Sequence, residues 1–272
     1  MSKLSIATII TTLIANASFN LEDYVKKDLI KNPNIKVKGV ELIEKKEVEN
    51  HKDWKAYLIL MNLEIKGKTD YYPETLFVNE KENLVSMDLY DYKEHKLLKK
   101  DLRPALTKDY YDKEHLIAGK ESAKHKLVVF SDPQCPFCQQ YIPKMYETVK
   151  KNPDTFALYY YHMPLKRIHP VSDTLTKVME VLQKEGKIDE AMKMYSLKID
   201  YREKNATKIL NAVNKQFNLN ISKEQIENPK VVKAVEEDIK KATRMMIKGT
   251  PTVYIDGKFD PQVTSYKKLL KK

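Results

Sequence analysis

The spacing of apolar positions changes along the chain, and the changes mark two halves. Between Leu21 and Pro33 apolar residues recur at helical spacing, so we expect a helix that ends near Asn32. Between residues 35 and 92 the period becomes two. The strand candidates, separated by turn-like segments, are residues 35–38, 56–65, 76–78 and 84–90. This order predicts an α+β module over residues 18–100.

The second half, residues 122–272, alternates strand and helix patterns. The expected order is a strand over 126–131, a helix ending near 152, a strand over 155–162, helices over 171–247, a hairpin starting at 253 and a short helix over 263–270. A helical pattern also runs from Arg103 to Ile117, with Gly119 placed to end it. We interpret residues 101–121 as a linker helix between the halves. A helix packed on one domain is the alternative.

The N-terminus has the pattern of an export signal. Lys3 precedes an uncharged, mostly apolar stretch that ends in Ala15-Asn16-Ala17, a small-x-small cleavage pattern. The stretch is short for a membrane span, which needs about 20 apolar residues. We expect residues 1–17 to be a signal peptide cleaved after Ala17 and the protein to reside in the periplasm. An uncleaved anchor and an ordinary first helix are the alternatives.

The charge does not single out a partner. The formal net charge is +11, but the lysines are spread along the chain and interleaved with acidic residues. A generally basic, solvated surface accounts for this balance better than a nucleic-acid or membrane site does. We therefore expect no nucleic-acid partner.

All the cysteine chemistry lies in one loop. Cys135 and Cys138, in Cys135-Pro136-Phe137-Cys138, are the only cysteines, and they stand between an apolar run and an amphipathic stretch. A disulfide across so short a loop would stabilise the chain by only roughly 2 kcal/mol in the entropic model. No second CxxC and no closely spaced pair of histidines completes a zinc site. We expect a redox-active pair and neither metal nor cofactor.

A strand that leads into a CxxC at the start of a helix is the arrangement of a dithiol–disulfide site. The helix N-terminus would favour the thiolate of Cys135, the attacking species. Cys138, one turn further along, would resolve a mixed disulfide. Phe137 supplies bulk without charge. Our hypothesis is that the pKa of Cys135 is depressed, but less than the roughly 3.5 of the strongest oxidases.

Several segments together resemble periplasmic thiol:disulfide interchange proteins of the DsbC/DsbG type, which have a thioredoxin fold. They are Ser131-Asp132-Pro133-Gln134-Cys135-Pro136-Phe137-Cys138, Tyr161-His162-Met163-Pro164-Leu165 with His169-Pro170, and Gly249-Thr250-Pro251-Thr252. The resemblance implies an N-terminal α+β dimerisation-type domain, a connecting helix and a C-terminal thioredoxin-fold α/β domain with a large helical insertion. It also implies a cis Thr250–Pro251 bond that faces the CxxC. Thr250, Pro251 and Phe137 would then contact substrate.

The resemblance further implies an activity and partners. The expected enzyme is a homodimeric protein disulfide oxidoreductase or isomerase with chaperone activity. Its substrates would be unfolded or misoxidised exported proteins, and a membrane partner of the DsbD or DsbB type would set its redox state. Pro136-Phe137 matches neither the oxidase dipeptide Pro-His nor the isomerase dipeptide Gly-Tyr. The direction of the reaction therefore stays open.

Weaker candidates complete the sequence reading. His162 and His169 could act as bases but suit structural roles better, and Asp132 could move protons for Cys138. Asn205, in Glu203-Lys204-Asn205-Ala206-Thr207, matches an extended bacterial N-glycosylation sequence, for which chance is an alternative. The alternative function is an exported holdase chaperone whose cysteine pair is only a structural disulfide.

Overall fold

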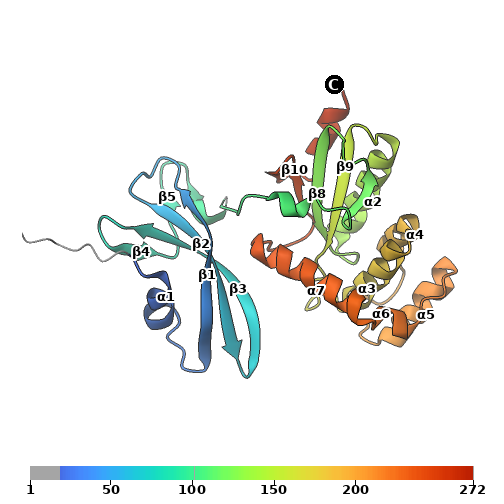
Figure 1. The fold of residues 1–272 in the computed structure, drawn as a ribbon, viewed down its shortest axis with the longest axis horizontal. Coiled ribbons are helices and arrows are strands. Elements are labelled where there is room, and N and C mark those ends of the chain that lie inside the picture. Colours follow the sequence, from blue (N-terminus) through green and yellow to red (C-terminus); the bar gives the residue numbers. More distant parts are fainter. Residues whose placement is uncertain (1–18, 101, 272) are drawn as a thin grey trace, which may run out of the picture. The chain divides into compact units, whose positions relative to one another are not determined.

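The computed structural model describes residues 19–100 and 102–271, and internal contacts divide the chain into two units, Met1–Leu102 and Arg103–Lys272 (Figure 1). The expected signal peptide and its cleavage site after Ala17 lie outside the described residues. None of the helices in the described part has the length and apolar character that a bilayer span requires.

Unit 1 contains an antiparallel sheet in the order β1-β2-β3-β4, as the two-residue period predicts. Its strands are β1 (Ile35–Glu47), β2 (Lys55–Ile65), β3 (Lys68–Asn79) and β4 (Leu84–Ser86). Before the sheet, α1 (Leu21–Tyr24) continues as the π-helical turn η1 (Val25–Leu29), so the helix ends before the expected Asn32. After the sheet come β5 (Tyr90–Asp91), β6 (Lys96–Leu97) and the 3₁₀ turn η2 (Leu98–Lys100).

The core of unit 1 depends on β2, which is buried on both faces. Tyr57, Ile59 and Met61 pack into one apolar cluster together with Val25 of η1. Ala56, on the opposite face of the same strand, packs into a second cluster. A strand that is covered on both faces has no solvent-exposed side, so its apolar and polar residues do not alternate. This is why residues 56–63 form an almost continuous apolar run.

Unit 2 is built on a five-stranded sheet in the order β11-β10-β8-β9-β7. The strands are β7 (Leu116–Gly119), β8 (His125–Ser131), β9 (Phe156–His162), β10 (Thr252–Ile255) and β11 (Lys258–Asp260). The central strand β8 and its neighbour β9 are parallel and are connected through α2 (Pro136–Lys151), while the other pairs are antiparallel. The final segment, η5 (Ser265–Lys271), is a 3₁₀ helix.

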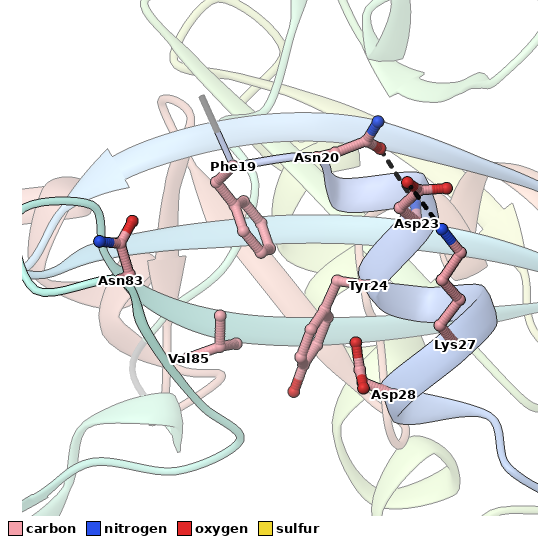
Figure 2. Close-up of a pocket in the computed structure, with 8 residues that line it drawn as sticks. All are labelled: Phe19, Asn20, Asp23, Tyr24, Lys27, Asp28, Asn83 and Val85. Atoms are coloured by element: carbon pink, nitrogen blue, oxygen red, sulfur yellow. Dashed lines mark hydrogen bonds and ion pairs between the residues drawn. The ribbon is translucent and has the colours of Figure 1, made fainter. Parts of the chain in front are cut away.

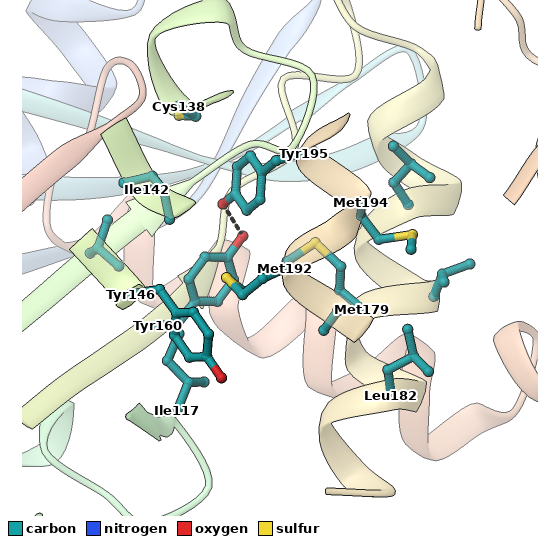
Figure 3. Packing of buried hydrophobic residues seen from close by; sticks show 14 of the residues in the cluster. Ile117, Cys138, Ile142, Tyr146, Tyr160, Met179, Leu182, Met192, Met194 and Tyr195 are labelled. Atoms are coloured by element: carbon teal, nitrogen blue, oxygen red, sulfur yellow. Dashed lines mark hydrogen bonds between the residues drawn. The ribbon is translucent and has the colours of Figure 1, made fainter. Parts of the chain in front are cut away.

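Both faces of this sheet are covered. On β8, Leu127 and Val129 pack into the larger apolar cluster, while Val128 and Phe130 pack into a second one. The tyrosine run of β9 divides in the same way, because Tyr160 enters the larger cluster and its neighbours on the strand enter the other. Figure 3 shows Tyr160 within the larger cluster. The run therefore serves sheet packing, as we expected.

Between β9 and β10 the chain forms the expected helical insertion. Its elements are α3 (Val171–Lys184), α4 (Ile188–Lys193), the 3₁₀ turn η4 (Met194–Ser196), α5 (Ala206–Phe217), α6 (Lys223–Ile226) and α7 (Pro229–Arg244). Side chains of Asn205, Ser222 and Asn228 cap α5, α6 and α7 by accepting hydrogen bonds from backbone N–H groups of the first turn. These caps explain why the long helical stretch is divided where it is.

The linker helix predicted for residues 101–121 is wrong. From residue 103 onward the segment belongs to unit 2 and contains only the 3₁₀ turn η3 (Lys108–Tyr110) before strand β7. Its apolar residues are used by different parts of the core: Tyr110 packs in one cluster, and Ile117 packs in the other, across the sheet. Contacts with β9 therefore override the helical spacing.

Gly119 does not end a helix, as the sequence predicted, but it has a left-handed backbone. Its φ is +80°, but it lies in β7, where a Cβ atom would stand 1.8 Å from the carbonyl oxygen of Phe156. Only glycine allows β7 and β9 to approach so closely at this point.

We predict that Gly119→Ala destabilises unit 2 by more than about 2 kcal/mol, because a strained backbone and a clash with Phe156 add. The matched control is Gly186→Ala, where φ is +73° but the added Cβ meets nothing within 4 Å. This variant should lose only about 1 kcal/mol. Urea denaturation followed by helical circular dichroism measures both. Equal losses in the free energy of unfolding for the two variants would mean that the close approach of Phe156 does not require glycine at position 119.

Candidate active site

The local sequence places Cys135 at the end of a strand and the start of a helix. β8 ends at Ser131, and α2 begins at Pro136, which fits the first helical position because it has no N–H to lose there. Between them Asp132 turns the chain: its Oδ1 accepts from Gln134 N at 2.7 Å and its carbonyl accepts from Cys135 N at 3.1 Å. Cys135 is thus the N-cap residue of α2.

The two cysteines differ in access to solvent. Both are free thiols; Cys135 is 6% exposed and Cys138 is fully buried. Cys138 lies within the first turn of α2 and belongs to the larger apolar cluster. Only Cys135 can therefore meet a large substrate.

Hydrogen bonds stabilise the thiolate of Cys135. The largest effect is the hydrogen bond from the Cys138 thiol, which lowers the pKa of Cys135; burial opposes it, and backbone N–H groups of Cys138 and Phe137 lower the pKa further. The net pKa is about 5. This value agrees with our hypothesis of a depressed pKa that stays above the roughly 3.5 of the strongest oxidases.

Cys138 has the opposite tendency. Burial raises the pKa of its thiol above the ordinary value, and the hydrogen bond that it donates to Cys135 raises it further. At neutral pH the pair therefore consists of one thiolate and one thiol. The outer sulfur is the charged one.

The chain after α7 brings Thr250 to Cys135. The Thr250–Pro251 peptide bond is cis, and the carbonyl oxygen of Thr250 lies 3.2 Å from Cys135 Sγ, which donates to it when protonated. Phe137 lies on the α2 side of the same loop and is 63% exposed. Two segments more than a hundred residues apart in the sequence thus meet at the outer cysteine.

Asp132 holds the loop rather than pointing at Cys138. Its buried carboxylate accepts four hydrogen bonds, from Gln134 N, Leu165 N, Ser172 Oγ and His169 Nδ1. The last three donors come from the β9–α3 connection and from α3 itself. We infer that Asp132 and His169 position the loop.

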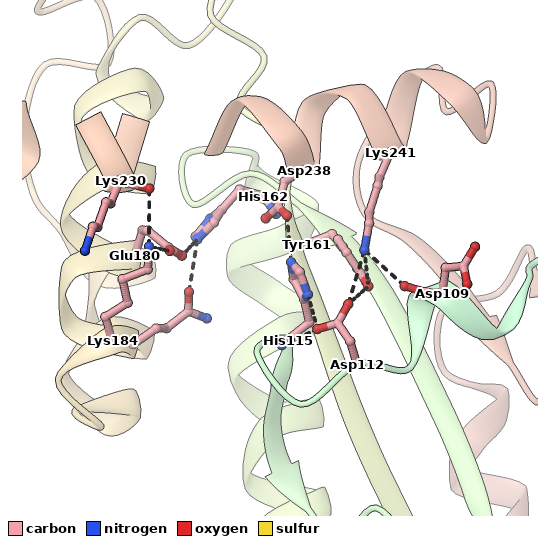
Figure 4. Close-up of polar contacts among 11 residues, drawn as sticks. Asp109, Asp112, His115, Tyr161, His162, Glu180, Lys184, Lys230, Asp238 and Lys241 are labelled. Atoms are coloured by element: carbon pink, nitrogen blue, oxygen red, sulfur yellow. Dashed lines mark hydrogen bonds and ion pairs between the residues drawn. The ribbon is translucent and has the colours of Figure 1, made fainter. Parts of the chain in front are cut away.

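His162 at the end of β9 and His115 just before β7 both take part in polar contacts with α7 (Figure 4). His162 is buried, with Nε2 3.1 Å from Gln183 Oε1, while its backbone N–H donates to Asp238 at 2.8 Å. His115 lies between two carboxylates: Nδ1 is 2.6 Å from Asp112 Oδ1 and Nε2 is 2.7 Å from Asp238 Oδ1. These contacts fix α7, the helix that precedes Thr250.

Sequence reasoning missed three hydroxyl groups beneath Cys138. The Ser131 hydroxyl lies 2.6 Å from the hydroxyl of Tyr195, which lies 2.8 Å from that of Tyr160, and a hydrogen bond from the Ser131 side chain lowers the pKa of the Cys138 thiol. Figure 3 shows the hydrogen bond between Tyr195 and Tyr160. A serine at the end of an otherwise apolar buried strand was the available signal for Ser131. Nothing in the sequence pointed to Tyr195.

Other candidates lie apart from the cysteines. Among the described residues no three His, Cys, Asp or Glu side chains group to hold a metal ion. In unit 1, Phe19, Tyr24 and Val85 line a pocket of about 450 Å³ whose polar wall includes Asp23 and Asp28 (Figure 2). The pocket contains neither cysteine. The exposed Asn205 caps α5, and its glycosylation stays a prediction.

Comparison with known proteins identifies the second unit. The family model described as thioredoxin matches residues 111–272. A thioredoxin-like oxidoreductase from Silicibacter pomeroyi is similar in structure, with a TM-score of 0.50 and 18% identity over 61% of this chain and 96% of that chain. BdbD from Bacillus subtilis aligns with a TM-score of 0.46 and 20% identity over 57% of this chain and 88% of BdbD.

Curated relatives match about half of this chain as part of larger proteins. The Na(+)/H(+) antiporter NhaA 1 of Mycolicibacterium vanbaalenii is 25% identical over 150 residues, which are 54% of this chain and 24% of the antiporter. NhaA 3 of Salinispora tropica is 23% identical over 150 residues, 22% of its length. The chain thus spans less than a quarter of the length of these relatives.

We predict that His115 stabilises the fold more in acid than in base. Burial lowers the pKa of His115, but hydrogen bonds and charge from Asp238 and Asp112 outweigh it, and the net pKa is raised. A raised folded-state pKa gives stability that is complete below the unfolded value of about 6.5 and is lost as the pH rises through the folded value. His115→Asn should therefore cost about 1–3 kcal/mol at pH 5.5 and less at pH 9.

Urea denaturation at both pH values measures this difference. His125→Asn is the matched control, because His125 pairs at 2.8 Å with Asp256, a carboxylate 45% exposed. Such a pair contributes about 1 kcal/mol or less. A loss for His115→Asn that does not change with pH would contradict the charged pair.

We also predict how the two thiols react with iodoacetamide. Cys135 should be alkylated with a midpoint near pH 5, whereas Cys138, buried and with a raised pKa, should stay unmodified in the folded protein. Cys138→Ala should move the midpoint upward, because it removes the hydrogen bond that lowers the pKa of Cys135 most. Intact mass after timed labelling gives both results. An unchanged midpoint in the variant would refute this role of Cys138.

Proposed function

The chain belongs to the thioredoxin family, and from that premise we propose that it is an exported thiol–disulfide oxidoreductase that acts on the disulfides of exported proteins. Cys135 is the nucleophile and Cys138 is the resolving thiol. The reaction uses no cofactor beyond this pair. In the DsbC/DsbG-type reading, the enzyme reshuffles or reduces incorrect disulfides.

One observation carries the proposal: the two sulfurs, one helical turn apart, have opposite tendencies to ionise. Cys135 has a pKa of about 5 at the surface end of α2, and Cys138 has a raised pKa beneath it. A structural disulfide requires no such difference. A dithiol that must attack and then release a substrate requires one sulfur that ionises readily and one that does not.

The reaction follows from this difference. The Cys135 thiolate attacks one sulfur of a client disulfide, the client S–S bond breaks, and the other client sulfur leaves as a thiolate. Cys138 then loses its proton and attacks Cys135, which forms the Cys135–Cys138 disulfide and releases the second client thiolate. The released sulfurs take up protons. The client disulfide has gained two electrons, and the protein dithiol has lost them; the reverse sequence donates a disulfide.

Thr250, Pro251 and Phe137 suit the binding of a client segment. Once Cys135 is a thiolate, it has no proton to donate, so the Thr250 carbonyl 3.2 Å away can accept an N–H from an extended client chain. Phe137, 63% exposed, offers an apolar surface beside the attacking sulfur. A hydrogen bond from the client backbone to Thr250, together with a small apolar contact at Phe137, would accept many different client sequences.

The setting remains part of the proposal. The signal-like N-terminus supports export to the periplasm, where client proteins carry disulfides. The separate α+β unit with its own core supports a role in homodimerisation, as in the DsbC and DsbG branch. A membrane partner of the DsbD type would keep the dithiol reduced, and one of the DsbB type would keep it oxidised.

Unit 1 favours a second activity beside the first, the binding of unfolded chains. Among its described residues, the exposed large apolar side chains are Tyr92, Tyr90, Leu84, Leu42 and Tyr71. Exposed apolar side chains of this kind can contact an unfolded chain where they form one contiguous surface. If holdase activity were the whole function, loss of both cysteines would leave the suppression of client aggregation intact.

We predict that Cys138→Ala accumulates mixed disulfides with client proteins, because Cys135 still attacks but nothing resolves the product. Cys135→Ala, the matched control with the same loop, should form none. Non-reducing electrophoresis and mass spectrometry of periplasmic extracts measure the adducts. Equal adduct formation by the two variants would refute the assignment of Cys135 as nucleophile.

The reduction potential of the Cys135–Cys138 couple, equilibrated with glutathione, separates the remaining roles. A value near about −120 mV indicates a disulfide donor, and about −180 to −230 mV indicates an isomerase or reductase. A value below about −300 mV indicates a structural disulfide. That last result would leave the chaperone as the function.

A further inference from the structure

Beneath Cys138 lies a chain of hydroxyl groups drawn from three separate elements. Ser131 ends β8, Tyr160 lies on β9, and Tyr195 comes from η4 in the helical insertion. The hydroxyls of Ser131 and Tyr195 are 2.6 Å apart, and those of Tyr195 and Tyr160 are 2.8 Å apart. A hydrogen bond from the Ser131 side chain also lowers the pKa of the Cys138 thiol. The chain thus starts at the resolving sulfur.

This chain of hydroxyl groups is buried away from solvent. Ser131 is 0%, Tyr160 1% and Tyr195 4% exposed. A buried hydroxyl that lacks a partner costs free energy, so these groups must satisfy one another. Inside a protein such linked hydrogen bonds also polarise each other.

In both hydroxyl pairs either oxygen can be the donor, and the hydroxyl at the Tyr160 end favours one direction. Each hydroxyl has one proton, and in the part of the chain that the structure describes Tyr160 has no carbonyl or carboxylate oxygen to donate to. The arrangement that uses every proton has Tyr160 donating to Tyr195, Tyr195 to Ser131, and Ser131 to the sulfur of Cys138. All three donors then point toward Cys138.

We propose that Tyr195 and Ser131 are positioning residues that stabilise Cys138 as a thiolate when it attacks the mixed disulfide, through the hydrogen bonds aligned from Tyr160. This inference rests on the proposed exchange reaction. During resolution the Cys138 S–H bond breaks, the Cys138–Cys135 bond forms, and the bond from Cys135 to the client sulfur breaks. The client thiolate leaves with the electron pair and takes up a proton, so the hydroxyls finish unchanged.

The three linked hydroxyl groups take the place that a carboxylate could have as the partner of the Cys138 sulfur. Asp132, the nearest buried acid in sequence, has both oxygens occupied by the four donors that hold the loop. A neutral donor chain eases ionisation of Cys138 without placing a second negative charge beside the Cys135 thiolate. Two adjacent anions would repel each other.

The test measures the two steps of exchange separately. Reduced protein is mixed with glutathione disulfide and quenched with acid at set times. Intact-mass spectrometry then follows the formation of the glutathione adduct of Cys135 and its resolution by Cys138. Tyr195→Phe and Ser131→Ala are compared with wild type between pH 5 and 9. Tyr159→Phe is the matched control, because this neighbouring buried tyrosine has a hydroxyl without a partner among the described residues.

We expect adduct formation at the wild-type rate in every variant. Resolution should slow by at least about tenfold in Ser131→Ala, which loses a direct bond to a charged group, and by about threefold to tenfold in Tyr195→Phe. The pH of half-maximal resolution should rise in both, and Tyr159→Phe should match wild type. A purely structural role would change unfolding but leave this pH profile in place.

The outcomes separate the two levels of the argument. If wild type forms no glutathione adduct, the proposed function fails. If wild type forms and resolves the adduct but Ser131→Ala and Tyr195→Phe behave like Tyr159→Phe, the exchange reaction stands and the role of the hydroxyl chain is refuted. An altered rate of adduct formation would reveal that a variant does not fold. The other variant then tests the role of the hydroxyl groups.

Discussion

The buried carboxylate of Asp132 is the constraint on which the geometry of unit 2 most depends. A charge inside a protein is tolerated only where hydrogen bonds replace its hydration, and Asp132 receives four. These bonds connect the end of β8, the loop before α2, the connection after β9 and the start of α3. Since the carbonyl of the same residue accepts from Cys135 N, the position of the outer cysteine follows from this anchor.

Two cysteines three residues apart acquire different chemistry because the helix separates their surroundings. Cys135 is the N-cap residue of α2, where hydrogen bonds from backbone N–H groups lower the pKa of its thiol, and Cys138 lies in the apolar core. The inner thiol donates to the outer thiolate, so burial of one sulfur supports ionisation of the other. In the proposed reaction the outer sulfur attacks first for this reason. The hydroxyls below Cys138 then make the second attack possible without another buried charge.

Strong local patterns were read correctly from the sequence, and weak ones were not. The strands over 126–131 and 155–162 are covered on both faces, so their continuous apolar character was unambiguous. Residues 103–117 have apolar positions that fit a helix equally well, yet Tyr110 and Ile117 pack on opposite sides of a sheet formed by distant strands. Spacing along the chain carries no information about which cluster an apolar residue will join.

The sequence by itself determined the elements that bear the chemistry: a buried strand, a CxxC with proline after its first cysteine, and a Thr-Pro before another strand. These depend on local rules of capping, helix dipoles and proline geometry. The family resemblance already implied that Thr250–Pro251 faces the CxxC. Only the tertiary structure decided that His169 and Asp132 hold the loop and that Tyr195 and Ser131 lie near Cys138. Such contacts join residues between 37 and 115 positions apart in the chain, and packing of the whole core brings them together.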